Sequence, residues 1–304
     1  MIAGLVALLG ALTFGLSSVF IRQAQLRGAA RGSELLVIAA VNVAVSAPAF
    51  GVQALSARVM PEITLLGVGV FALAGLLSTF GGRQLMFAAM RHIGPSRAGS
   101  LKSLAPLFTA LVAVPLLGEP YPLIKALGTG IAVGGLWLLS RDLFGGGVAD
   151  ADGGRSGAGL ALGIAAAVAW GFGYVLRKLG LLEVPLPLLG VLIASVVALV
   201  GALIHAGVRG QRSLSMRYFG GGSALRALLV GSLLATAGQI CVFVALHLTA
   251  ATSAVVLLVS MDPLFTLAAS RLLLGDSERL NRLAVLAIAL TTVGGAVVFA
   301  APGM

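Results

Sequence analysis

The sequence predicts an all-α polytopic membrane protein whose ten transmembrane helices form two inverted repeats of five. Three observations lead to this fold class. The composition is too apolar for a soluble protein, the apolar residues fall into ten long runs, and the second half of the chain repeats the pattern of the first.

Of the 304 residues, 59% are hydrophobic and 10% are charged, whereas about 25% of residues are charged in an ordinary soluble domain. The mean hydropathy is +1.08. This composition excludes a cytosolic enzyme, a secreted disulfide scaffold and a disordered chain. The net charge of +10 comes from basic residues that cluster between the apolar runs, which favours contact with lipid head groups and not with nucleic acid.

A bilayer crossing needs about 20 apolar residues, and ten runs of the sequence are close to that length or longer. They extend over Ile2–Ile21, Leu35–Leu55, Ile63–Met90, Pro95–Leu117, Pro122–Ser140, Gly157–Leu176, Pro185–Ala206, Leu225–Leu248, Thr252–Leu274 and Leu283–Ala301. The sixth run ends at Leu176, which places Arg177 and Lys178 in the loop that follows it.

A segment rich in Gly and Asp, residues 141–156, divides the chain and is typical of a flexible linker. It separates a first five-helix repeat, residues 1–140, from a second, residues 157–304. A shift of 157 residues aligns LKSLAPLFTALVAVPLLGE, which begins at Leu101, with LVSMDPLFTLAASRLLLGD, which begins at Leu258. The shared PLFT and LLG at one spacing indicate an internal duplication.

Each repeat has five spans, an odd number, so the second repeat enters the membrane in the opposite direction to the first. The expected result is a pseudo-twofold axis in the plane of the membrane. Transporters use this architecture and bind their substrate near the midplane, where the two repeats meet.

The two aligned segments resemble the EamA-type members of the drug/metabolite transporter superfamily, and the resemblance covers nearly the whole chain. It implies that helices one, three and four, with six, eight and nine, surround a central cavity, while helices five and ten lie outside. Such families export amino acids and other metabolites, and relatives carry nucleotide sugars, drugs or lipid-linked sugars. The resemblance suggests cytoplasmic termini, whereas the basic loops favour the opposite orientation, so the orientation stays open.

Charged side chains inside a span are the first candidates for a substrate site, because each is costly unless it snorkels, pairs or lines water. Asp262 lies in the middle of the ninth run, where the first repeat has Ala105. It is a candidate to bind a cation, to take up a proton, or to satisfy backbone N–H groups beside Pro263. Lys102 aligns with the neutral Val259 of the second repeat. It is a candidate to pair with Asp262, to bind part of a zwitterion, or to extend its side chain to the membrane surface.

Arg83, in the third run, either clamps a carboxylate or phosphate or extends to the membrane surface. If Arg83 and Lys102 both face the cavity, the site is net positive and suits an anionic or carboxylate-bearing cargo. Neutral polar and aromatic side chains complete the predicted substrate site, although each of them is equally suited to packing helices together. They are Gln84, Ser103, Ser260, Thr266, Trp170, Gln239 and Ser17.

Pro106 and Pro263 are expected to kink the fourth and ninth helices at the cavity, because each frees a backbone carbonyl in mid-span. Small residues on the fifth and tenth helices serve either internal packing or a homodimer contact. They are Ala126, Gly130 and Gly134 on the fifth and Ala287, Thr291 and Gly295 on the tenth. Glu119 and Asp276, which end the fourth and ninth runs, are expected to be loop-facing turn residues.

These observations predict a secondary transporter that exports small polar metabolites, such as amino acids, by alternating access around a midplane cavity. The alternative cargoes are amphiphilic drugs, nucleotide sugars and lipid-linked compounds. No catalytic function, cofactor or metal is expected, because the three histidines are scattered and a P-loop is absent; coupling to protons is a further option. The expected location is the bacterial inner membrane, with a small-molecule substrate, the bilayer and a second copy bound through helix five or ten as partners.

Overall fold

The computed structural model describes residues 1–30, 32–56, 60–86, 88–89, 92, 101–102, 104–143, 153–208, 218–274 and 282–300. In the first half the helices are α1 (Ile2–Leu26), α2 (Ser33–Ser56), α3 (Leu65–Ala74), the π-helix η1 (Gly75–Gly82), α5 (Ala105–Leu117) and α6 (Leu123–Leu143). In the second half they are α7 (Gly153–Glu183), α8 (Pro187–Val208), α9 (Gly221–Leu248), α10 (Thr252–Val259), α11 (Asp262–Leu274) and α12 (Arg282–Ala300).

These helices correspond to the ten predicted runs, and the predicted fold class is confirmed. The runs that are both long and apolar enough to cross a membrane are α1, α2, Leu65–Met86, Gly157–Glu183, α8 and α9. Shorter apolar helices account for the other runs in the part of the chain that the structure describes. The third run continues from α3 into η1 without a break, and the ninth is divided into α10 and α11.

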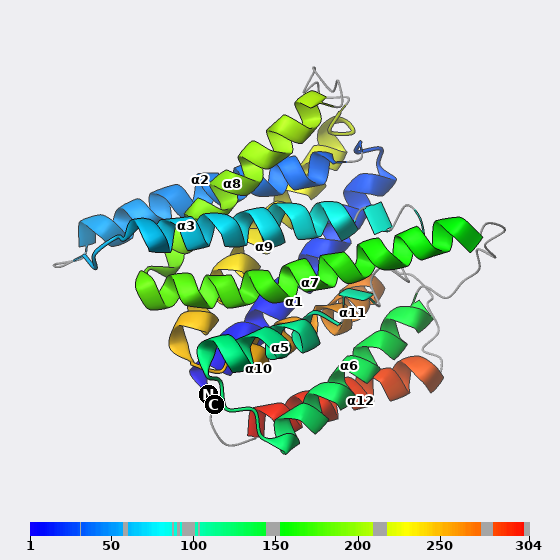
Figure 1. The fold of residues 1–304 in the computed structure, drawn as a ribbon. Helices are drawn as coiled ribbons and strands as arrows, with labels where there is room; N and C mark the ends of the chain where they lie inside the picture. The colour runs from blue at the N-terminus through cyan, green and yellow to red at the C-terminus, as the bar shows by residue number, and fades with distance from the viewer. Residues whose placement is uncertain are drawn as a thin grey trace.

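The first helix of each half packs against helices of the other half, as expected for an inverted repeat (Figure 1). Helix α1 packs against α9 and α11 of the second half, and its counterpart α7 packs against α3, η1 and α5 of the first half. The remaining helices pair with their own counterparts, α2 with α8 and α6 with α12. Each half therefore depends on the other for much of its helix packing.

Equivalent glycines make two of these contacts possible. A Cβ at Gly15 would lie 2.8 Å from the backbone nitrogen of Thr266, and a Cβ at Gly171 would lie 3.0 Å from the backbone nitrogen of Thr109. The glycines occupy matching places in the two repeats, and so do the two threonines. The crossings of α1 over α11 and of α7 over α5 are thus the same contact built twice, with no room for a side chain.

The prolines of the duplicated motif mark equivalent helix starts. Helix α5 begins at Ala105, directly before Pro106, and α11 begins at Asp262, directly before Pro263. Proline is well accommodated in the first turn of a helix, where its missing N–H group leaves no partner unsatisfied. The break predicted in the ninth helix is therefore present, with Ser260 ending α10.

Helices α6 and α12 lie at the edge of the bundle, where they pack mainly against each other (Figure 1). The expected small-residue contact is present on α12, because Ala287, Thr291 and Gly295 are buried there. On α6 the stripe of Ala126, Gly130 and Gly134 is exposed, and no neighbouring atom lies within 4 Å of a Cβ added at either of its two glycines. Internal packing by this stripe is therefore wrong, and a homodimer contact stays a prediction.

A different face of α6 makes the contact. A Cβ at Gly128 would lie 3.0 Å from the carbonyl oxygen of Gly294, and a Cβ at Gly135 would lie 2.6 Å from the backbone nitrogen of Thr291. Internal packing was expected of the wrong face because glycines occur on both faces of this helix. Spacing alone does not tell which face another helix covers.

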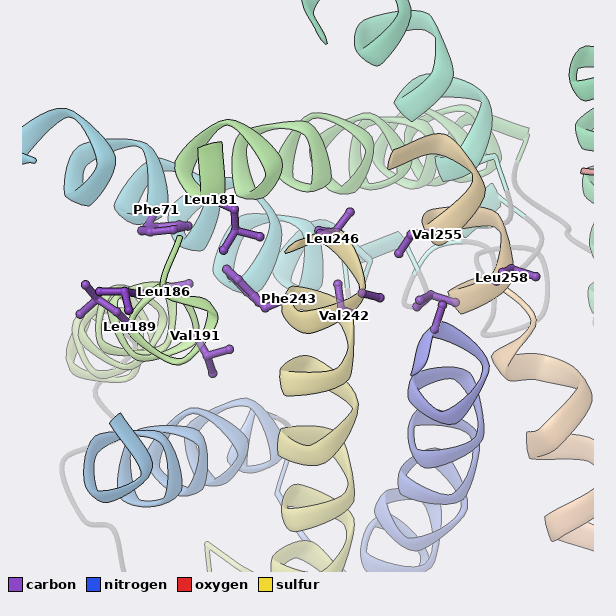
Figure 2. Packing of buried hydrophobic residues seen from close by; sticks show 14 of the residues in the cluster. Phe71, Leu181, Leu186, Leu189, Val191, Val242, Phe243, Leu246, Val255 and Leu258 are labelled. Atoms are coloured by element: carbon purple, nitrogen blue, oxygen red, sulfur yellow. The ribbon is translucent and has the colours of Figure 1, made fainter. Parts of the chain in front are cut away.

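The largest apolar cluster among the described residues joins α1, α3, α7, α8, α9 and α10 (Figure 2). Phe71 of α3 and Phe243 of α9 are both fully buried, with ring centroids 6.0 Å apart. Leu181 and Leu246 pack beside them. This cluster holds these helices together next to the charged groups described below, since Phe243 also contacts Arg177.

We expect Gly15→Val to destabilise the protein by about 1–3 kcal/mol, because the new side chain has to displace the backbone of α11. Gly130→Val is the matched control, since it makes the same change in a helix where the added atoms meet nothing. Thermal unfolding of both purified variants measures the difference. Equal melting temperatures for the two variants would contradict the packing described for α1 and α11.

Candidate functional site

An ion pair joins the two repeats at their helix breaks. The Nζ atom of Lys102 donates a hydrogen bond to Oδ2 of Asp262 at 2.9 Å. The side chain of Lys102 is 37% exposed and that of Asp262 is 10% exposed. The structure thus brings together the two charged residues whose pairing was one of the options that the sequence left open.

The position of Asp262 suits a carboxylate. It is the first residue of α11, and the N-terminus of a helix attracts negative charge because its first N–H groups have no partner within the helix. Asp262 therefore combines two stabilising influences, a lysine from the other repeat and the end of its own helix.

Trp170 of α7 lies between this pair and the end of η1. The Nζ atom of Lys102 lies 5.5 Å from the centre of the Trp170 ring, within the range of a cation–π interaction. The same ring packs on Gly82 at the end of η1, where an added Cβ would lie 3.1 Å from the indole nitrogen. Trp170 thus contacts Lys102, another predicted site residue. It also packs on Gly82, the residue directly before Arg83, which is a third predicted site residue.

Arg177 belongs to the same region, and the sequence prediction placed it wrongly. It was assigned to a loop, but α7 continues to Glu183 and buries Arg177 to 5% exposure. Its Nη2 atom donates hydrogen bonds to Oγ of Ser78 at 2.9 Å and to Oγ1 of Thr79 at 3.3 Å. The π-helix η1 supplies both hydroxyl groups.

Two aromatic rings surround the Arg177 guanidinium. Its central carbon lies 5.0 Å from the centre of the Tyr174 ring and 5.2 Å from that of Phe243. Trp170, Tyr174 and Arg177 follow one another at intervals of four and three residues, which places them on one face of α7. That spacing, together with the apolar residues that continue to Leu182, is the signal in the sequence that could have identified Arg177.

Lys178 was assigned to the same loop, which is also wrong, and the structure gives it a role in helix packing. Its Nζ atom donates to the carbonyl oxygens of Leu246 at 2.9 Å and Thr249 at 2.8 Å. Carbonyls at the end of a helix lack partners within that helix, so Lys178 caps the end of α9. Neighbouring basic residues of α7 therefore have different functions.

Arg83 lies beside this group of cations. It follows η1 directly and is partly exposed. It adjoins Gly82, on which Trp170 packs, and it follows Thr79, whose hydroxyl group accepts a hydrogen bond from Arg177, by one helical turn. Gln84 is the next residue of the same segment and is also partly exposed.

The other predicted site residues have varied surroundings. Ser17 donates to the carbonyl oxygen of Gly231 at 2.7 Å, and Thr266 donates to those of Asp262 at 2.9 Å and Gly15 at 3.3 Å. These hydroxyl groups bond to backbone of their own or a neighbouring helix. A substrate contact by Ser17 or Thr266 stays a prediction.

Three predicted site residues remain, Gln239, Ser260 and Ser103. Gln239 is 2% exposed, and its Nε2 atom has no hydrogen-bond partner among the described residues. Ser260 is partly buried at the break between α10 and α11. Ser103 lies outside the described residues. Within those residues, no group of three or more His, Cys, Asp or Glu side chains is arranged to hold a metal ion.

The expectation that Glu119 faces a loop is also wrong. Its side chain is buried, and its carboxylate accepts hydrogen bonds from the backbone nitrogen of Ser253, at 3.2 and 3.3 Å, and from the Ser253 hydroxyl group. Ser253 lies in the first turn of α10, where N–H groups lack partners within the helix. A residue of the first repeat therefore caps a helix of the second. Asp276, the matching acid of the second repeat, lies outside the described residues.

We expect Glu119→Ala to lower the free energy of unfolding by about 1–3 kcal/mol, because it leaves a buried N–H group without an acceptor. Glu183→Ala is the control, since Glu183 is exposed and should change stability by less than about 0.5 kcal/mol. Chemical denaturation of the purified variants provides the comparison. A loss no larger for Glu119→Ala than for the control would contradict the capping role.

Comparison with known proteins agrees with this architecture. The model of the EamA-like transporter family matches residues 1–141 and 157–300. No curated protein matches the chain. A solved structure titled "Crystal structure of protein" is similar in fold, with a TM-score of 0.70 over 97% of this chain and 95% of that chain, at 20% sequence identity. The chain therefore belongs to the EamA-like transporter family and is a multi-pass integral membrane protein.

Proposed function

We propose that this transporter exports small polar metabolites, such as amino acids, by alternating access around a site at Lys102 and Asp262. The expected location is the bacterial inner membrane. The observation that carries the proposal is the 2.9 Å ion pair between Lys102 and Asp262. It joins the two repeats, and inverted-repeat transporters bind their substrates where their repeats meet.

The pair suits a zwitterionic cargo because it offers both charges at one place. A carboxylate of the cargo takes the place of Asp262 beside Lys102, and an ammonium group takes the place of Lys102 beside Asp262. Each protein charge keeps an opposite charge next to it in the empty and in the loaded site. That exchange avoids the cost of leaving a buried charge unpaired, which is high inside a membrane.

Movement between the two orientations requires the repeats to change their contacts. Helices α5 and α11 begin at the proline breaks, where a change of direction costs few backbone hydrogen bonds. The Glu119 carboxylate ties the end of α5 to the start of α10, so it is suited to hold the repeats together on one side of the membrane. In this proposal that contact opens when the site becomes accessible from its side.

Asp262 is also the candidate for proton coupling. When Asp262 separates from Lys102, a proton that binds to its carboxylate makes the group neutral. A neutral group costs less to move through the interior of a membrane protein than an unpaired charge. Transport that depends on Asp262 should then also depend on pH.

We expect Asp262→Asn to reduce exchange of the cargo by roughly tenfold or more, because an amide does not replace the charge beside Lys102. The assay is counterflow in proteoliposomes with a panel of labelled amino acids, organic anions and nucleotide sugars. Glu183→Gln, at an exposed site on α7, is the control and should transport at the wild-type rate. A folded Asp262→Asn variant with normal rate and normal pH dependence would disprove the role of Asp262.

A further inference from the structure

Among the described residues, the basic groups beside α7 outnumber the acidic ones. Lys102 lies 5.5 Å from the centre of the Trp170 ring and Arg177 lies 5.0 Å from that of Tyr174, while Arg83 directly follows Gly82, on which Trp170 packs. Asp262 is the carboxylate that the structure shows in this group, and it is bonded to Lys102. The Lys102–Asp262 pair is neutral overall, which leaves the two guanidinium groups without a compensating charge among the described residues.

In the part of the chain that the structure describes, Arg177 contacts neutral groups. Two hydroxyl groups of η1 accept hydrogen bonds from Nη2, and the rings of Tyr174 and Phe243 pack near its guanidinium group. Its Nε atom is buried and has no hydrogen-bond partner in the described part of the chain. Buried charges in proteins are normally paired with an opposite charge, so Arg177 departs from that rule in the interior of a membrane protein.

The other acids whose side chains the structure describes are engaged elsewhere or exposed. Glu34 accepts hydrogen bonds from Gln25 and from the backbone nitrogen of Gly32, and Glu119 caps α10 as described above. Glu62 and Glu183 are exposed. Within the described residues the ion pair is that of Lys102 with Asp262, so none of these four carboxylates is paired with Arg83 or Arg177.

We infer that Arg83 and Arg177, beside Tyr174, bind the dianionic part of the cargo, either two carboxylates or a phosphate monoester, so that the exported metabolite carries about two net negative charges. The inference rests on the proposed function, because it takes the region of Lys102 and Asp262 as the cargo site. It narrows the substrate class, since a neutral zwitterion brings no net charge and leaves both arginines uncompensated.

The chemistry of the two arginines fits this class. A guanidinium group presents several N–H donors in one plane, which matches carboxylate and phosphate oxygens. The hydroxyl groups of Ser78 and Thr79 and the ring of Tyr174 fix the plane of Arg177. Because Arg83 and Lys102 are partly exposed and Arg177 is buried, the cargo meets Arg83 and Lys102 first and reaches Arg177 when the hydroxyl groups of η1 release it.

The test varies the charge of the cargo on one carbon skeleton. Glutarate, glutamate and glutamine have similar shapes and carry two, one and no net negative charges at neutral pH, and glycerol phosphate represents the phosphate monoesters. Counterflow in proteoliposomes should exchange glutarate or glycerol phosphate at least roughly tenfold faster than glutamine. Which of the two dianions is faster distinguishes a dicarboxylate from a phosphate cargo.

The outcomes separate this inference from the proposed function. If glutamine or other neutral amino acids exchange as fast as both dianions, the inference is wrong and the proposed export of amino acids stands. If neither dianion exchanges, the inference is also wrong, whatever else is carried. A protein that is folded but exchanges nothing in the wider panel overturns the proposed function as well.

Variants then assign the selectivity to the arginines. Arg177→Gln and Arg83→Gln should each weaken binding of the preferred dianion by roughly 10-fold to 100-fold, measured calorimetrically in detergent, and should lower the ratio of dianion to glutamine exchange. Arg226→Gln removes the same charge from an exposed arginine of α9 and should change neither value. If Arg177→Gln fails to fold, Arg177→Lys and Arg83→Gln provide the test, because a lysine keeps the charge but loses the planar donors. An unchanged ratio in the folded variants would refute the assignment.

Discussion

The structure depends on one constraint, which is that a charge inside a membrane protein needs an opposite charge or a polar partner close by. Lys102 and Asp262 meet this constraint by pairing across the two repeats. Lys178 meets it by capping α9, and Glu119 by capping α10. The polar contacts of the interior therefore connect elements that are distant in the sequence, and the apolar helices pack around these connections.

The scaffold is duplicated, but its chemistry is not. The glycine crossings and the proline breaks occur once in each repeat, as Gly15 and Gly171 and as Pro106 and Pro263 show. The ion pair has no such counterpart, because Lys102 and Asp262 align with neutral residues. In the proposed transport cycle, a symmetric scaffold gives two equivalent orientations similar energies, and the asymmetric charges select one kind of cargo.

Much of the fold could be predicted from the sequence, because hydropathy and an internal repeat are local properties of a chain. The aligned motifs predicted a change of direction at Pro106 and Pro263, and they left the pairing of Lys102 with Asp262 as one of several options. Arg177 was missed because a basic pair looks like the end of a span when only hydropathy is considered. The burial of Glu119 and the face of α6 that packs on α12 depend on contacts between distant segments, for which spacing along one helix is no guide.

The most direct test of this account exchanges the two charges. Lys102→Asp and Asp262→Lys should each lower the melting temperature of the purified protein, because each places like charges side by side. The double variant restores an ion pair and should recover most of the loss, though not all of it, since a lysine at the start of α11 opposes the helix dipole. A double variant no more stable than the weaker single variant would show that the pair does not hold the two repeats together.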